Sequence, residues 1–102
     1  MTYLVKARAR LDLKSHWRYI GRDSVQAADH LLEAAQETFE LLAGNPGIGS
    51  QRSFRKLAGI RSHAVTGFPN YLVFYETRRE SVVILRVLHG MRDLPRFFRR
   101  KR

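Results

Sequence analysis

The residues of this sequence that could do chemistry are basic side chains on or beside its apolar segments. Arg61 precedes one such segment, Arg86 lies within another, and His89 follows the second directly. Arginine can clamp phosphates or stabilise a pentacovalent transition state, and histidine exchanges protons near neutral pH. These types allow phosphodiester chemistry, although each arginine can equally pair with a carboxylate of its own fold. The basic set of this region is Arg52, Arg55, Lys56, Arg61 and Arg86.

Other active-site patterns are missing from the sequence. No two histidines stand at the helical i, i+4 spacing and there is no cysteine, so neither a histidine nor a thiolate metal site is expected. Gly47-Ile48-Gly49 lacks the lysine of a phosphate-binding loop, and no Gly-x-Ser-x-Gly motif marks a serine hydrolase. We therefore expect no metal and no cofactor. The histidines are His16, His30, His63 and His89.

Charge is segregated along the chain. The formal net charge is +10, yet the segment from Asp23 to Gln51 contains five acids and no Lys or Arg, a net charge of −5. All 19 bases and the other four acids lie outside that segment, which leaves +15 there. So uneven a distribution produces a focused basic face. Such a face attracts nucleic acid, a nucleic-acid machine or acidic protein segments.

Length and composition predict a single domain over residues 1–102. Of the 102 residues, 44% are hydrophobic, so the chain can build one core but not two. The first six residues contain no long apolar run typical of a signal peptide. No segment approaches the roughly 20 apolar residues of a membrane-spanning helix. Because the lack of cysteine also fits a reducing compartment, we expect a cytoplasmic protein without a membrane partner.

The first half of the sequence predicts a short strand followed by two helices. Residues 3–5 are β-prone, and Asp12 is expected to cap a first helix that ends at Gly21. Asp23, with Gln26 three residues later, forms a capping-box variant that opens a second helix. That helix has one apolar face and an acidic opposite face. The short connection requires the two helices to pack as an antiparallel hairpin.

The second half predicts strands. After the breaker-rich loop 44–50, the apolar period changes from that of a helix to that of strands. The expected strands are residues 62–66, 71–77 and 81–88. Short turns between them favour an antiparallel meander, and a last short helix is expected to begin near Asp93 and carry Phe97 and Phe98. The fold class is α+β in the order β-α-α-β-β-β-(α), with a helical hairpin packed on a small antiparallel sheet.

Four segments stand in a distinctive order along the chain, after an opening helix that contains Trp17-Arg18-Tyr19-Ile20. They are Pro46-Gly47-Ile48-Gly49, Leu57-Ala58-Gly59-Ile60-Arg61-Ser62, Asn70-Tyr71-Leu72-Val73-Phe74-Tyr75 and Ile84-Leu85-Arg86-Val87-Leu88-His89-Gly90-Met91-Arg92-Asp93. Together they resemble the ParE branch of the ParE/RelE toxin superfamily over nearly the whole chain, and the last segment is the most specific. The resemblance implies one half of a type II toxin–antitoxin pair, with a helical hairpin against a small antiparallel sheet.

The resemblance implies one of two targets. ParE-like members inhibit DNA gyrase and so arrest growth, and the preferred function is such an inhibitor without catalytic residues. RelE-like members are ribosome-dependent ribonucleases that cut mRNA, and in that case Arg61, Arg86 and His89 are the expected catalytic residues. In a gyrase inhibitor, Arg61 instead anchors the loop before its strand, and Arg86 pairs with an acid such as Asp93. His89-Gly90 then shapes the turn into the last helix.

The C-terminal segment is the expected contact with gyrase. From Arg92 to Arg102 it contains six bases and one acid, beside two phenylalanines that could instead anchor a helix to the core. A plain DNA- or RNA-binding module is a third possibility, which the acidic character of the longer helix disfavours. The expected target-binding residues are Arg92, Arg96, Phe97, Phe98, Arg99 and Arg100.

A cognate acidic antitoxin is the expected partner in a hetero-oligomer. Trp17 and Tyr19 are two positions apart, so on a helix they face different sides, and Tyr19 is expected near solvent. Exposed apolar residues bordered by arginines suit an amphipathic helix or strand that carries acids. A disordered acidic tail that folds there would cover apolar area and neutralise charge. The expected antitoxin-binding residues are Tyr3, Leu11, Arg18, Tyr19 and Arg22.

Overall fold

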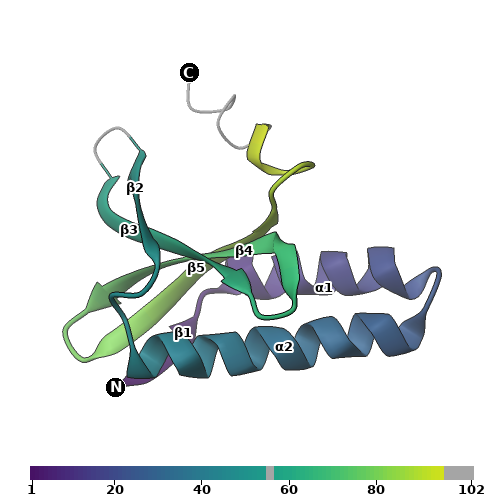
Figure 1. Ribbon diagram of the computed structural model, residues 1–102, viewed down its shortest axis with the longest axis horizontal. Coiled ribbons are helices and arrows are strands. Elements are labelled where there is room, and N and C mark those ends of the chain that lie inside the picture. Colours follow the sequence, from purple (N-terminus) through teal and green to yellow (C-terminus); the bar gives the residue numbers. More distant parts are fainter. Residues whose placement is uncertain (55–56, 96–102) are drawn as a thin grey trace.

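A computed structural model describes residues 1–54 and 57–95 of the chain. Two helices lie side by side on one face of a five-stranded sheet (Figure 1). The elements are β1 (Thr2–Val5), α1 (Ala7–Gly21), α2 (Val25–Gly44), β2 (Ser50–Phe54), β3 (Leu57–Val65), β4 (Phe68–Arg78) and β5 (Ser81–His89). The expected α+β class and the helical hairpin are confirmed. Neither helix of the described ranges is long and apolar enough to cross a membrane.

The expected antiparallel meander is present, and a parallel edge strand, β1, makes the sheet mixed. The strand order is β1-β5-β4-β3-β2, and β2 to β5 pair antiparallel in sequence order. β1 instead runs parallel to β5, with Leu4 opposite Val83. Parallel neighbours need a long crossover connection, and the helical hairpin with the meander provides it. β2, and the start of β3 at Leu57, were not expected because residues 50–61 lack the apolar alternation of strands.

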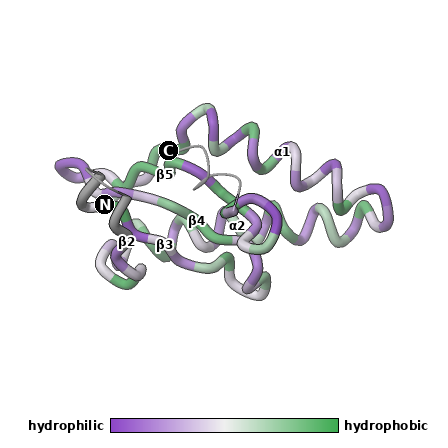
Figure 2. The backbone as a smooth tube through the Cα atoms, turned by 90° about the horizontal axis from the view of Figure 1, so that it is seen from above, coloured by the Kyte–Doolittle hydropathy of each residue, from purple (hydrophilic) through white to green (hydrophobic). Residues whose placement is uncertain are grey.

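Both helices begin elsewhere than the sequence predicts. α1 begins at Ala7, directly after β1, and no side chain caps its first turn. Its alternating Ala and Arg residues have high helix propensity, so Asp12 falls inside the helix and not at its start. Ser24, not Asp23, caps α2, because its Oγ accepts a hydrogen bond from the Ala27 N–H at 3.0 Å. The turn between the helices extends beyond the ends of the strands (Figures 1 and 2).

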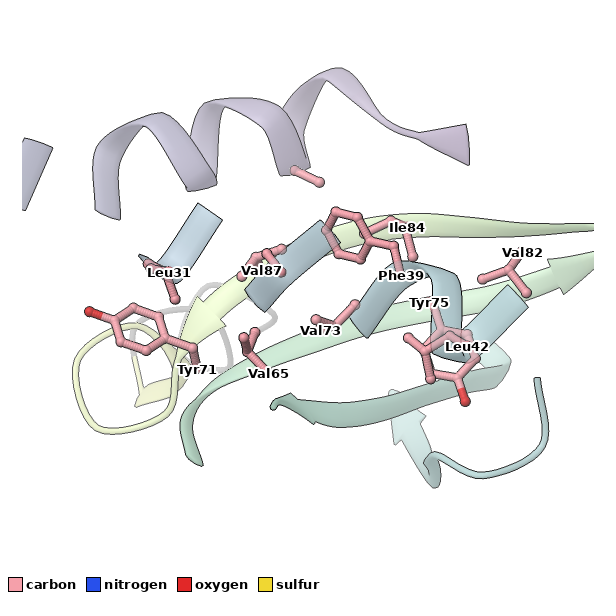
Figure 3. Close-up of a cluster of buried hydrophobic side chains, with 12 residues drawn as sticks. Leu31, Phe39, Leu42, Val65, Tyr71, Val73, Tyr75, Val82, Ile84 and Val87 are labelled. Carbon is pink, nitrogen blue, oxygen red and sulfur yellow. The ribbon is translucent and has the colours of Figure 1, made fainter. Parts of the chain in front are cut away.

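The main core lies between the hairpin and the sheet. Leu31, Phe39 and Leu42 of α2 point towards the apolar side chains of the strands, which include Val73 and Ile84 (Figure 3). All of these are almost completely buried. Each such side chain contributes about 1.5–3 kcal/mol to folding, so this layer carries most of the apolar stabilisation. The hydrophobic colouring of β4 and β5 in Figure 2 agrees with their central position in the sheet.

A smaller apolar cluster lies on the other face of the sheet. Ile60, Phe74 and Leu88 are buried there, and Leu94 packs against them. Successive residues of a strand face opposite sides, which explains why Val73 and Phe74 belong to different clusters. Residues 94–95 have a helical backbone where the last helix was expected. Phe97, Phe98 and the rest of that expected helix lie outside the described residues.

Asp12 joins α1 to β5. β1 ends at Val5, and the Lys6 N–H makes the last backbone bond to this edge, to the Ile84 oxygen at 2.9 Å. Farther along the same edge, Asp12 Oδ2 accepts the Val87 N–H at 2.9 Å. Its two oxygens also accept from Nε and Nη2 of Arg86, at 2.8 and 2.9 Å. The helix therefore replaces a strand as the partner of this part of β5.

Replacing Asp12 with alanine should lower the free energy of unfolding by about 2–3 kcal/mol, because Val87 loses its acceptor and Arg86 loses this ion pair. Denaturant unfolding followed by circular dichroism measures the change. Glu33→Ala, which removes an exposed acid of α2, is the control and should shift stability by less than about 0.5 kcal/mol. Equal unfolding midpoints for the two variants would contradict this role of Asp12.

Candidate functional site

Arg61 of β3 holds the loop between α2 and β2. Its Nη1 donates to the Gly49 oxygen at 2.7 Å and to the Gly47 oxygen at 3.3 Å. The Tyr75 hydroxyl acts on the same loop, donating to the Pro46 oxygen at 2.8 Å and accepting the Gly49 N–H at 2.9 Å. Burial raises the pKa of Tyr75, so the hydroxyl keeps the proton that it donates to the Pro46 oxygen. The anchoring of the loop expected for Arg61 is therefore present.

Gly49 shows why this loop needs glycine. A Cβ at this position would lie 2.9 Å from the Ser62 oxygen, a backbone atom that cannot move aside, and would also collide with the Tyr75 hydroxyl. A Cβ at Gly47 would meet no atom within 4 Å. The second glycine of the Pro46-Gly47-Ile48-Gly49 segment is thus required by the close approach of the loop to β3 and β4.

Arg86 is paired with Asp12 and not with Asp93, which corrects the expected partner. The hydrogen bonds that Arg86 donates to the Asp12 carboxylate raise the pKa of Arg86. Asp93 Oδ2 instead accepts the His89 N–H at 2.7 Å. The cause is the early start of α1, which carries Asp12 over the edge of β5. An acid does hold Arg86, but it comes from the opposite end of the chain.

His89 shapes the turn after β5, as expected. Its Nδ1 accepts the N–H groups of Met91 and Arg92, both at 3.2 Å, and Gly90 donates to the Asn70 oxygen at 2.7 Å. Burial lowers the pKa of His89, and the charge of Arg92 lowers it further. The imidazole is therefore held in its neutral form, in which Nδ1 is an acceptor.

A cluster that the sequence did not reveal surrounds Arg92. Its guanidinium lies 4.2 Å from the centre of the Tyr19 ring, and its Nη2 is 3.5 Å from His16 Nδ1. The Tyr71 ring lies edge-on between the rings of His16 and His89, with 4.9 Å between centroids on each side. Burial raises the pKa of Tyr71 although Arg92 opposes this. The only feature of the sequence that could have indicated this cluster is the position of His16, which lies one helical turn after Asp12 and so on the same face of α1.

The three residues expected in a ribonuclease are not brought together. In the register of the sheet, Arg61 of β3 lies opposite Tyr75 of β4, whereas His89 of β5 lies opposite Tyr71 of β4. Four residues of a strand span about 13 Å, and Arg61 and His89 also lie on strands on opposite sides of β4. Arg86 is turned towards α1. Each residue therefore has a separate environment and a separate structural contact.

Four of the five expected antitoxin-binding residues share one groove on α1. The groove is lined by Leu11, Lys14, Ser15, Arg18, Tyr19 and Arg22. Leu11 is 60% exposed and Tyr19 is 53% exposed. Trp17 faces α2, where its Nε1 donates to Asp29 at 2.8 Å. Tyr3 lies elsewhere, on β1, with its ring centroid 5.6 Å from that of Phe39.

Of the expected target-binding residues, the structure describes only Arg92. Arg96, Phe97, Phe98, Arg99 and Arg100 lie outside the described residues. Within residues 1–54 and 57–95, no group of three or more His, Asp or Glu side chains could hold a metal ion. The described part of α1 offers a basic, partly apolar groove.

Comparison with known families agrees with this architecture. A family model described as the ParE toxin of the type II toxin–antitoxin system parDE matches residues 3–94. The chain belongs to this ParE toxin family. A chain in a solved structure titled "Chromosomal ParDE TA system from P. aeruginosa" has the same fold, with a TM-score of 0.71 and 17% sequence identity over 87% of this chain and 95% of that one. No curated protein matches the sequence.

Several structural contacts of this toxin involve the segments that carry the resemblance. Pro46 to Gly49 is the loop held by Arg61 and Tyr75. Arg86 to Asp93 contains the ion pair with α1 and the turn built on His89. These segments therefore have structural roles in the fold.

The stability of this toxin should fall as the pH is lowered through the titration of His89. Because the folded pKa lies below the ordinary value of 6.5, the unfolded chain binds the proton first. The free energy of unfolding therefore declines as the pH drops below about 6.5. His89→Asn keeps an acceptor for the turn but removes the titrating group, so it should flatten this decline.

Thermal unfolding of both proteins between about pH 7 and pH 5 measures the difference. His30→Asn, which changes an exposed histidine of α2, is the control and should keep the slope of the unmodified toxin. A His89→Asn variant with that same slope would show that His89 does not cause it.

Proposed function

We propose that this toxin inhibits DNA gyrase by binding it, and that a cognate acidic antitoxin neutralises the toxin in a hetero-oligomer. The observation that supports an inhibitor over a ribonuclease is the engagement of Arg61, Arg86 and His89. Arg61 holds backbone carbonyls, Arg86 holds Asp12, and His89 accepts two backbone N–H groups. These three side chains are therefore fixed in separate structural contacts, which disfavours their acting together on one phosphodiester.

Arg92 supports a contact through the segment after β5. Its guanidinium lies over Tyr19 and next to His16, so both side chains come from α1. A cation over an aromatic face contributes about 0.5–2 kcal/mol, enough to favour one position of the turn. The start of the basic segment is thereby held against α1, where it can meet a large partner.

The purified toxin should inhibit the supercoiling of relaxed plasmid DNA by gyrase. The double variant Arg99→Glu with Arg100→Glu should lose most of this inhibition, because it reverses charge in the proposed contact. Arg8→Glu, which reverses an exposed charge on α1, is the control and should inhibit normally. Supercoiling that proceeds unchanged at saturating toxin would exclude this target.

Primer extension on mRNA after induction tests the alternative function, a ribosome-dependent ribonuclease, which would leave cuts between codon positions.

The groove on α1 is the proposed site for the antitoxin. Its apolar residues, Leu11 and Tyr19, line the groove together with the cationic side chains of Lys14, Arg18 and Arg22. An amphipathic acidic helix would cover the former and neutralise the latter. Interfaces of this kind bury roughly 1,200 Å² or more in total, so the partner should extend beyond the groove.

The variants Tyr19→Ala and Arg18→Glu should each weaken antitoxin binding about tenfold or more, because truncation of a central interface residue costs over 1 kcal/mol. Isothermal titration calorimetry measures the affinity, and circular dichroism checks that each variant is folded. Gln36→Ala on the exposed side of α2 is the control. A complex in which Tyr19 and Arg18 remain in water would refute this placement.

A further inference from the structure

A second groove lies where β1, the start of α1 and the β4–β5 turn meet. Its basic residues come from two separate places, Lys6 and Arg10 before and within α1, and Arg78 and Arg79 at the turn. Arg78 forms an ion pair with Glu76, so its charge is compensated. Lys6, Arg10 and Arg79 have no acidic partner in the described part of the chain, and no acid lines the groove there. Three cations therefore border one groove without a carboxylate to neutralise them.

Arg79 has a backbone conformation that glycine would adopt with less strain. Its φ is +53°, and it is the first residue of the two-residue turn that joins β4 to β5. Glycine is favoured at a positive φ in such hairpin turns because a Cβ is strained there. The reversal of the chain does not require an arginine at this position, which points to a use for its side chain.

The groove lies at the opposite end of β5 from the proposed contact with gyrase. The β4–β5 turn precedes Ser81 at the start of β5, whereas Arg92 follows His89 at its end (Figure 1). The strand from Ser81 to His89 spans about 26 Å, at about 3.3 Å for each residue step. A protein held at Arg92 can therefore leave the groove open to a second ligand.

We propose that this groove binds the phosphate backbone of the duplex DNA that gyrase holds. Lys6, Arg10 and Arg79 contact phosphate oxygens and displace the counterions condensed on the DNA. Contacts to phosphates do not depend on base sequence, which suits an inhibitor that must act wherever the enzyme is bound. The inference rests on the proposed inhibition of gyrase and adds that the toxin contacts the enzyme and its DNA at the same time.

Duplex DNA matches this groove better than other polyanions or a second toxin. Its phosphates supply one negative charge for about every 1.7 Å of helix axis, so a duplex laid across the groove meets the cations of both sides. An acidic protein segment would need carboxylates at two particular positions. The acidic helix α2 contributes no residue to the lining, so its charges do not border the bound backbone. A second copy of this chain, docked groove to groove, would bring like charges together.

The affinity of the full-length toxin for gyrase, measured with and without a linear DNA duplex, tests this contact. We expect the duplex to increase the affinity about tenfold or more, a gain of at least about 1.4 kcal/mol. The triple variant Lys6→Gln, Arg10→Gln, Arg79→Gln should bind gyrase alone as the unmodified toxin does and should lose the gain from DNA. Arg8→Gln is the control, because an exposed residue two positions before Arg10 is rotated by about 200° around α1. Circular dichroism checks that each variant is folded.

The salt dependence of binding identifies phosphate contacts. For a labelled DNA duplex and the full-length toxin, each phosphate contact contributes about −0.9 to the slope of log association constant against log salt concentration. The slope of the triple variant should therefore be shallower by about 2.7, and that of Arg8→Gln should equal the slope of the unmodified toxin.

The possible outcomes separate this contact from the proposed function. A toxin that inhibits gyrase but gains no affinity from DNA, or a triple variant with an unchanged salt slope, would overturn the DNA contact alone. A triple variant that binds gyrase more weakly in the absence of DNA would show that the groove holds protein, and an RNA duplex bound more tightly than DNA of the same sequence would also overturn the assignment. An unmodified toxin that binds no gyrase, with or without DNA, would overturn both proposals.

Discussion

The carboxylate of Asp12 is the interaction on which the arrangement of the two layers depends. β1 has four residues and covers only the first part of β5, so the edge of β5 would otherwise be open at Val87. Asp12 accepts the Val87 N–H, and His16, one turn later, lies 2.8 Å from the Val87 oxygen. A shift of the helix by one residue would rotate both side chains by about 100° and break this pairing. Arg86 of β5 donates a hydrogen bond to the same carboxylate and so fixes its position against the sheet.

The position of α1 also determines how the chain continues after β5. His16 meets both Tyr71 and Arg92, and Arg92 lies against Tyr19. The groove on α1 and the start of the basic C-terminal segment are therefore contiguous, with Tyr19 belonging to one and touching the other. Under the proposed function, an antitoxin in that groove lies directly beside the segment that gyrase would meet. Overlap of the two sites is then sufficient for neutralisation, without a conformational change.

The sequence predicted those features that local periodicity or composition determines. It did not predict the features that depend on contacts between segments far apart in the chain. The apolar patterns of α2, β4 and β5 are long and regular, and the starts of these elements were predicted to within three residues. β2 has no such pattern and exists because it pairs with β3. Asp12 resembled a helix cap, since no local signal distinguishes a capping carboxylate from one that reaches another layer. For the same reason the partner of Arg86 was sought at Asp93 nearby, and not 74 residues away.

In the candidate site, too, the sequence predicted some contacts and missed those that depend on distant segments. The anchoring by Arg61 was expected under the resemblance to ParE-like inhibitors, whereas the cluster around Arg92 required the tertiary positions of His16 and Tyr71. A fold shared by gyrase inhibitors and ribonucleases cannot by itself distinguish them. The difference lies in whether the basic residues are free to act. Releasing Arg86 from Asp12 would cost about 1.5–3 kcal/mol for each charged hydrogen bond and would open the edge of β5. In this toxin Arg61 and Arg86 hold parts of the fold together, and under the proposed function its partners are recognised elsewhere on the surface.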